Sequence, residues 1–256
     1  MRTTPRAAPA VVVLVHGAFT DASVWTEVAA VLTARGLDVR TPANPLRGLA
    51  PDTAHLADVV RRTAAPVVLV GHGYGGAVVT QAAAGAGRAV ALCYVAGFGL
   101  DTGECVLDVT GRFPAMPLLG SSLTADPAAL ARTPAARGRE LYLRAERFGP
   151  AYAADLPDPL RRTLSGRQRP ITLGALTDTS GPPAWAGLPA WYAIAGADRL
   201  VNPTAQRFMA QRMAATERVL DGSHAVVLSQ PDAVAAMIAE AAARSAGGAA
   251  AHPRHR

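Results

Sequence analysis

The chain has 256 residues, of which 50% are hydrophobic and 17% charged, and its formal net charge is +6 at pH 7. This length fits one α/β domain, with or without an inserted subdomain, and the hydrophobic fraction excludes a disordered chain. Much of the positive charge lies at the two ends, in Arg2, Arg6, Arg254 and Arg256, and no basic and aromatic stripe lies between them, so we expect no nucleic-acid binding.

Short apolar runs alternate with longer helical segments along the chain. The expected strands are 11–15, 37–40, 66–70, 89–95, 190–195 and 217–220. The expected helices are 23–34, 52–63, 74–84, 203–214 and 231–245. Several strand runs are apolar on both faces, as buried parallel strands are. The alternation predicts an α/β fold, with a mostly parallel sheet and helices on both of its faces.

One long segment, residues 99–186, interrupts this alternation. It contains no clear buried strand, and Pro, Arg and scattered aromatic residues are frequent in it. We interpret it as a helical cap inserted between two parts of the core, residues 10–98 and 187–245. Residues 1–9 and 246–256 are predicted to be flexible tails, because they are low in complexity or precede the first apolar run.

Neither membrane segments nor disulfides are expected. The first apolar run, 11–15, is too short for a secretory signal, and no uninterrupted apolar run is long enough to cross a membrane. Cys93 and Cys105 are expected to be inert, buried thiols. We therefore expect a cytoplasmic protein with no membrane partner, and the sequence leaves a homodimer open.

The most informative segment is residues 67–79, in which a strand leads through a Gly-rich turn into a helix. This is the context of a nucleophile elbow of the pattern G-x-S-x-G, with Gly71 and Gly75 as the outer glycines. The central position, where a nucleophilic side chain is expected, is occupied by Gly73. Glycine adopts the strained elbow conformation at low cost, so the turn should persist although an acyl-enzyme cannot form.

Together with the segment 13–25, a strand followed by a His-Gly turn and a helix, the elbow carries a resemblance to a known family. The chain resembles α/β-hydrolases of the bacterial small-molecule esterase type, related to the plant methylesterase and hydroxynitrile lyase branch, over about residues 10 to 245. The family's acid position falls on Asp198 and its histidine on His224. The chain order of elbow, acid and histidine is that of the fold.

The resemblance implies a role for each of these positions. Asp198 should orient and polarise His224, and the backbone N–H groups of Ala18 and Tyr74 should form an oxyanion hole. Such donors need no particular side chain, so Gly73 does not remove them. Ser223 is next to His224, but consecutive loop side chains diverge, which makes it a poor substitute nucleophile.

We expect a largely apolar pocket for a small hydrophobic substrate, built partly from the cap. The residues expected to border it are His16, Phe19, His72, Phe113, Met116, Tyr142, Phe148 and Trp185. Some of the cap residues must instead pack the cap onto the sheet, and His16 and His72 are expected to be hydrogen-bonded structural residues. Tyr74 could equally belong to the core. No metal-ligand spacing is present, so we expect neither a metal nor another cofactor.

Three functions remain open from the sequence. In the first, an enzyme of secondary metabolism uses His224 and Asp198 as a general acid–base pair without a covalent intermediate, in lyase, cyclase, isomerase or water-mediated hydrolytic chemistry. In the second, a serine ester hydrolase has had its nucleophile replaced by Gly73 in the laboratory. In the third, the protein binds a ligand without converting it.

Overall fold

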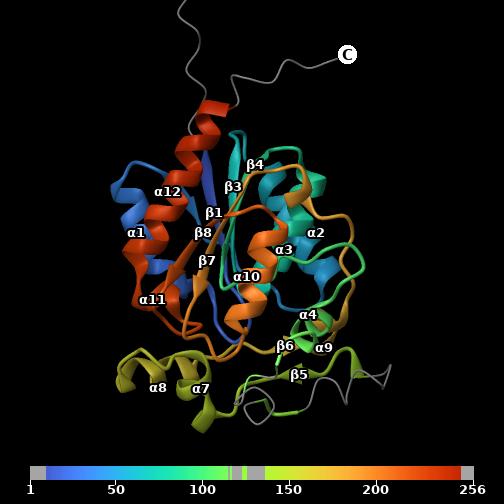
Figure 1. Ribbon diagram of the computed structural model, residues 1–256, viewed down its shortest axis with the longest axis vertical. Helices are drawn as coiled ribbons and strands as arrows, with labels where there is room; N and C mark the ends of the chain where they lie inside the picture. Colours follow the sequence, from blue (N-terminus) through green and yellow to red (C-terminus); the bar gives the residue numbers. More distant parts are fainter. Residues whose placement is uncertain (1–9, 115, 117–122, 126–135, 249–256) are drawn as a thin grey trace, which may run out of the picture.

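The structure, a computed structural model, describes residues 10–114, 116, 123–125 and 136–248 (Figure 1). The expected tail at residues 1–9 lies outside this part of the chain. At the other end, the last helix continues to Gly248 and so enters the segment expected to be a tail, of which the remainder, 249–256, also lies outside the described residues.

A six-stranded sheet forms the centre of the molecule, and its strands are paired in the order β2-β1-β3-β4-β7-β8. The strands are β1 (Val11–Val15), β2 (Asp38–Arg40), β3 (Val67–His72), β4 (Ala89–Val95), β7 (Ala190–Ala195) and β8 (Thr216–Leu220). Every pair in this sheet is parallel. The predicted α/β fold with a mostly parallel sheet is therefore confirmed.

Helices cover both faces of the sheet, as Figure 1 shows. One apolar layer joins one face to α1 (Thr26–Ala34), α11 (Val226–Ser229) and α12 (Pro231–Gly248). The layer on the other face includes residues of α2 (Leu49–Arg61), α3 (Tyr74–Ala86) and α10 (Pro203–Arg212). A short 3-10 turn, η1 (Ala22–Trp25), precedes α1 where the sequence predicts one continuous helix.

Most of the region between β4 and β7 gathers at one end of the sheet, and its last part runs back beside α3 to the start of β7 (Figure 1). Its helical elements are α4 (Val106–Gly111), α7 (Ala145–Tyr152), α8 (Asp158–Gly166), α9 (Leu173–Thr177) and the 3-10 turn η3 (Ala184–Ala186). An antiparallel pair, β5 (Glu140–Leu141) and β6 (Ile171–Thr172), lies among them. The segment expected to be a helical cap thus also contains one short antiparallel pair, which the sequence did not indicate because strands of two residues leave no alternation.

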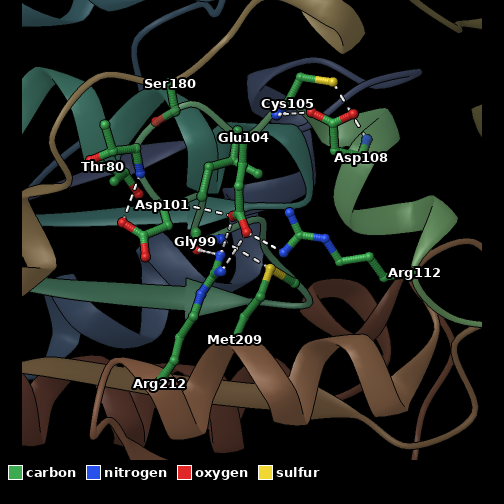
Figure 2. A network of polar contacts seen from close by, with 12 residues as sticks. Thr80, Gly99, Asp101, Glu104, Cys105, Asp108, Arg112, Ser180, Met209 and Arg212 are labelled. Carbon is green, nitrogen blue, oxygen red and sulfur yellow. Dashed lines mark hydrogen bonds and ion pairs between the residues drawn. The ribbon is translucent and has the colours of Figure 1, made fainter.

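A buried ionic network fastens the beginning of this region to the end of α10 (Figure 2). The carboxylate of Glu104 accepts hydrogen bonds from Arg212, at 2.7 and 2.8 Å, and from Arg112. Arg212 also donates to the carbonyl of Gly99, just after β4. Burial acts to raise the pKa of Glu104, but the hydrogen bonds from Arg212 and from the Asp101 backbone together have the larger, opposite effect. The pKa is therefore lowered from 4.5 to about 2. Ionised Glu104 therefore links the beginning of the cap to α10 of the core.

Among the helices in the described part of the chain, none combines the length and the apolar character needed to span a lipid bilayer.

Candidate active site

The elbow predicted at Gly73 is present at the carboxyl end of β3. Gly73 has φ +52° and ψ −123° and directly precedes α3. A Cβ on Gly71 would lie 2.5 Å from the backbone of Gly75, and a Cβ on Gly75 would lie 2.4 Å from the carbonyl oxygen of Val15. Strand β3, helix α3 and strand β1 thus meet backbone to backbone, so the outer glycines are required for the sharp turn.

The α-carbon of Gly73 faces the imidazole of His224. A Cβ built on Gly73 would lie 3.0 Å from Nε2 of His224 and 3.3 Å from its Cε1. Both distances are shorter than an ordinary van der Waals contact, so the imidazole borders directly on the space that a nucleophile's side chain would need. A residue with a side chain at position 73 would require the imidazole to move by a few tenths of an ångström.

His224 and Asp198 form a buried pair, 5% and 1% exposed. Nδ1 of His224 lies 2.7 Å from Oδ2 of Asp198, which also accepts a hydrogen bond from Nε2 of Gln206 at 2.8 Å. Oδ1 of Asp198 accepts from the backbone N–H groups of Leu200 and Val201 at 2.8 and 3.0 Å. An ionised carboxylate only accepts hydrogen bonds, so this pattern assigns the proton to Nδ1. The lone pair of Nε2 then faces Gly73.

His72 supports the backbone of His224 from the side of the sheet. Its Nε2 donates to the carbonyl oxygen of His224 at 2.8 Å, and the two ring centroids are 4.6 Å apart. Burial, followed by the neighbouring His224, lowers the pKa of His72 well below 6.5, so the ring is neutral at pH 7. His72 thus acts as the hydrogen-bonded structural residue that the sequence suggests.

The turn after β1 lies against the elbow. A Cβ on Gly17 would lie 2.8 Å from the carbonyl oxygen of His72, so the two turns are in close backbone contact. Nδ1 of His16 bonds the Gly17 carbonyl at 2.9 Å, and its Nε2 accepts the N–H of Asn44 at 2.9 Å. Burial lowers the pKa of His16, which keeps this ring neutral as well. His16 therefore holds the turn in place through Asn44.

This contact brings the two predicted oxyanion-hole residues to neighbouring turns. Ala18 follows Gly17, and Tyr74 is the first residue of α3, whose N–H has no acceptor within the helix. Phe19 follows Ala18 with a positive φ of +65°, a strained conformation for a residue with a side chain. Such strain is typical of loops that the surrounding structure holds for a function.

Two aromatic side chains of α7 cover the pair. The ring of Tyr152 lies edge-on to His224 with centroids 5.0 Å apart, and its hydroxyl is 3.4 Å from Oγ1 of Thr20. Phe148, one of the predicted pocket residues, stacks on Tyr152 at 5.0 Å. Both are fully buried. The cap thus contributes an apolar wall directly above the dyad.

The remaining predicted pocket residues of the cap have other neighbours. The ring of Phe113 packs against Phe208 at 5.6 Å. Trp185 donates to the carbonyl of Leu100 and lies 5.8 Å from the guanidinium of Arg212. The Tyr142 hydroxyl is near the surface, 3.3 Å from Glu140, and Met116 is half-buried. The contacts of Phe113, Trp185 and Tyr142 therefore place them in the framework of the cap rather than beside His224.

The sequence did not reveal several residues that complete the site. Gln206 orients Asp198 from α10, and Asn44 holds His16 from the loop after β2. The hydroxyl of Tyr74 donates to Asp52 at 2.8 Å, so this side chain belongs to the core. These partners are distant in sequence or carry no motif. The sequence offered a signal for Asp52 alone, as an acid in the first turn of a helix, where it suits the helix dipole; its burial and its bond to Tyr74 are seen in the structure.

Within the described residues, no three His, Cys, Asp or Glu side chains are grouped so that they could hold a metal ion. The chemical groups that the site offers are therefore an imidazole base, its carboxylate partner and backbone N–H donors.

Comparison with known proteins gives a consistent family signal. The profile of the alpha/beta hydrolase family matches residues 12–237. No curated protein matches the sequence. A pyrethroid hydrolase from Sphingobium faniae is 21% identical, with a TM-score of 0.74 over 91% of this chain and 97% of its own. A methylesterase from Arabidopsis is 20% identical, with a TM-score of 0.74 over 92% and 99%. An extracellular alpha/beta-hydrolase from a Paenibacillus species is 19% identical, with a TM-score of 0.73 over 91% and 99%.

Proposed function

This chain belongs to the alpha/beta hydrolase family, and we propose that it is an enzyme that acts on a small hydrophobic carbonyl or ester compound without forming an acyl-enzyme. One observation carries the proposal. The buried Asp198–His224 pair is complete, and its free Nε2 faces an elbow residue that has no side chain.

In the proposed reaction, Nε2 of His224 removes a proton from a substrate C–H or O–H group, or from a water molecule bound above Gly73. The imidazole becomes an imidazolium, which the carboxylate of Asp198 stabilises at 2.7 Å. Negative charge that develops on the substrate oxygen is met by the N–H groups of Ala18 and Tyr74. The imidazolium then returns its proton to the product. Lyase, cyclase, isomerase and water-mediated hydrolytic reactions all fit this sequence of steps.

The cost of burying the pair argues for catalysis over passive binding. A buried carboxylate is stable only when its hydrogen bonds are satisfied, and Asp198 receives four, from His224, Gln206, Leu200 and Val201. A protein that only binds a ligand has no need for this arrangement directed at an elbow residue without a side chain. The names of the structural neighbours, a pyrethroid hydrolase and a methylesterase, support an ester or carbonyl substrate.

A second candidate is a serine ester hydrolase in which the nucleophile has been replaced. The observation that favours it is the φ of Gly73, +52°, because the elbow keeps a conformation that would be strained for a residue with a side chain although no side chain is present. Against it, a serine Cβ at this position would lie 3.0 Å from Nε2 of His224, so the imidazole would have to move by a few tenths of an ångström.

Proton abstraction can be tested directly in deuterated water. Wild-type protein is incubated with a panel of carbonyl compounds bearing acidic C–H groups and of methyl and aryl esters, and NMR follows deuterium uptake and product formation. We expect His224→Ala to abolish both, whereas His55→Ala, on the exposed side of α2, leaves them unchanged. Equal conversion by His224→Ala would contradict the proposal.

The same panel separates the two candidates. If Gly73→Ser produces a strong gain in aryl ester hydrolysis with a burst of the first product, the replaced-nucleophile function is supported. No gain supports a site that works without a nucleophile. Tight binding of a panel compound that His224→Ala does not weaken, without any conversion, would instead indicate a ligand-binding protein.

A further inference from the structure

The loop that carries His224 is attached to the cap on both sides of the histidine. On one side, Ser223 donates its N–H to Oδ2 of Asp155 at 3.0 Å, and its hydroxyl lies 2.5 Å from Oδ1 of the same carboxylate. On the other side, the N–H of Ala225 donates to the carbonyl oxygen of Tyr152 at 2.9 Å. The two residues that flank the histidine are therefore held by a single cap turn, 152–155.

The hydroxyl of Ser223 connects these contacts. It lies 3.1 Å from the carbonyl oxygen of Tyr152 and accepts the N–H of Ala225 at 3.1 Å. Ser223 is fully buried, so each of these polar groups depends on its protein partners rather than on water. Its side chain turns away from Gly73 and into the cap, which also explains why it does not replace the missing nucleophile.

The cap turn is itself braced from α8. Arg161 donates from Nε to the carbonyl of Leu156 at 2.5 Å and from a terminal nitrogen to the carbonyl of Ala154 at 2.6 Å. A turn that is fixed in this way transmits its position to whatever it binds. On the sheet side, the carbonyl of His224 receives the hydrogen bond from His72. The backbone of His224 is thus held between the core and the cap.

We propose that Asp155 and Ser223 are positioning residues for His224, through which the cap sets the direction of the general base. This inference rests on the role of His224 in the proposed function. Among the described residues, the hydrogen bonds of Asp155 and Ser223 go to the backbone and side chains around the loop and not to the imidazole ring, so both act through the backbone on either side of it. If the loop tilts, the bond from Nδ1 to Asp198 lengthens and the lone pair of Nε2 turns away from the elbow.

Asp155 provides a clean test because it is exposed, so its substitution should not prevent folding. Asp155→Asn removes the charge and one of the two acceptor atoms, and Ser223→Ala removes the hydroxyl that joins the contacts. Glu146→Gln is the matched control: it removes one negative charge from the surface of α7, and its side chain has no hydrogen bond to the loop in the described residues. Urea unfolding establishes that each variant is folded, and Asp155→Asn decides the question if Ser223→Ala does not fold.

The first readout does not depend on a substrate. NMR of histidine-labelled protein measures the exchange with water of the Nδ1 proton of His224, which is assigned by its loss in His224→Ala. We expect exchange to become about tenfold faster in Asp155→Asn and Ser223→Ala, as expected when a charged hydrogen bond that orders the loop is lost, and unchanged in Glu146→Gln. Exchange as slow in Asp155→Asn as in the control overturns the proposal.

The second readout uses any compound that the wild type converts and His224→Ala does not. We expect kcat to fall about tenfold in Asp155→Asn with little change in KM, because the base and not the binding surface is displaced. An unchanged kcat overturns the proposal. If no compound is converted, the proposed function fails, and the exchange rates still decide whether the cap positions His224.

Discussion

The two halves of the candidate site are built by different means. The elbow half is made of backbone: Gly71, Gly73 and Gly75 bring β3, α3 and β1 together, and its central position has no side chain. The half with Asp198 and His224 is made of side chains, and each polar atom that stabilises the pair has a named partner.

This difference shows that the two halves are stabilised by different interactions, and that the elbow does not need a nucleophile to keep its shape. The elbow keeps its sharp turn without one, because the glycines around it specify the turn. The dyad, by contrast, is stable only as a set, since a buried charge whose partner is lost is strongly destabilising. The elbow should therefore respond to changes of volume, and the dyad to changes of hydrogen bonding.

The largest expected effect is on the dyad side. Asp198→Asn keeps an oxygen where Leu200 and Val201 donate, which places the amide NH₂ opposite Nδ1 of His224. The imidazole is then driven to the tautomer protonated on Nε2, which is not a base toward the substrate. We expect turnover to fall about 10⁴-fold, the loss that the wrong tautomer causes in serine proteases.

Steady-state kinetics on a compound converted by the wild type would measure this loss. Asp221→Asn is the control, since it makes the same change at an exposed position in the same loop. If the two variants had the same turnover, Asp198 would have no part in the reaction.

The elbow should be disrupted by an added side-chain atom. Gly75→Ala would place a Cβ 2.4 Å from the carbonyl oxygen of Val15 and 2.9 Å from that of His16, both of them backbone atoms that cannot easily move. We expect a loss of about 3 kcal/mol in the free energy of unfolding. Gly85→Ala, in the same helix, meets no atom within 4 Å and should be neutral or stabilising by up to about 1 kcal/mol. Equal urea midpoints for the two variants would contradict a turn specified by backbone contact.

The smallest effect concerns the tie between sheet and cap at Glu104 (Figure 2). Glu104→Gln removes the charge that pairs with Arg212 and Arg112, and we expect a loss of about 2 kcal/mol at pH 7. The pKa of Glu104 is lowered from 4.5 to about 2 in the folded protein. Its contribution is thus complete above pH 4.5 and is lost as the pH falls toward 2.

Urea unfolding at several pH values should show the difference between wild type and Glu104→Gln shrinking below pH 4.5. Glu146→Gln, on the exposed surface of α7, is the control for the loss of one surface carboxylate. If the difference in unfolding free energy between wild type and Glu104→Gln stayed constant between pH 7 and pH 3, the charge of Glu104 would not be what stabilises the fold.

The fold and the centre of the site could be predicted because each is encoded by short, continuous stretches of sequence. The buried strands are continuous apolar runs, and Gly73, Asp198 and His224 each lie in a short motif at the end of a strand. The support of the site could not be predicted in the same way. Gln206, Asn44 and Asp155 meet their partners only after the chain has folded, and none of them has a distinctive neighbourhood in the sequence.

The cap shows the same limit more strongly. Phe113 and Trp185 are aromatic and lie in the inserted region, so the sequence favours them as pocket residues, yet they pack near Phe208 and Arg212. Tyr152, which lies against His224, has no feature in the sequence that separates it from them. Aromatic residues in an insertion indicate that an apolar layer exists, but the packing of the helices decides which of them border a site.

The packing of the outer glycines separates the residues that make the fold from the residue that would make the chemistry. Gly71 and Gly75 specify the turn by close backbone contact, while a side chain at position 73 would meet chiefly the imidazole of His224. A side chain can thus be added or removed there at a cost of about 1–3 kcal/mol in backbone strain, without a change of fold. The turn is therefore encoded by residues other than the one whose side chain would face His224, so a substitution at position 73 leaves the instructions for the fold intact.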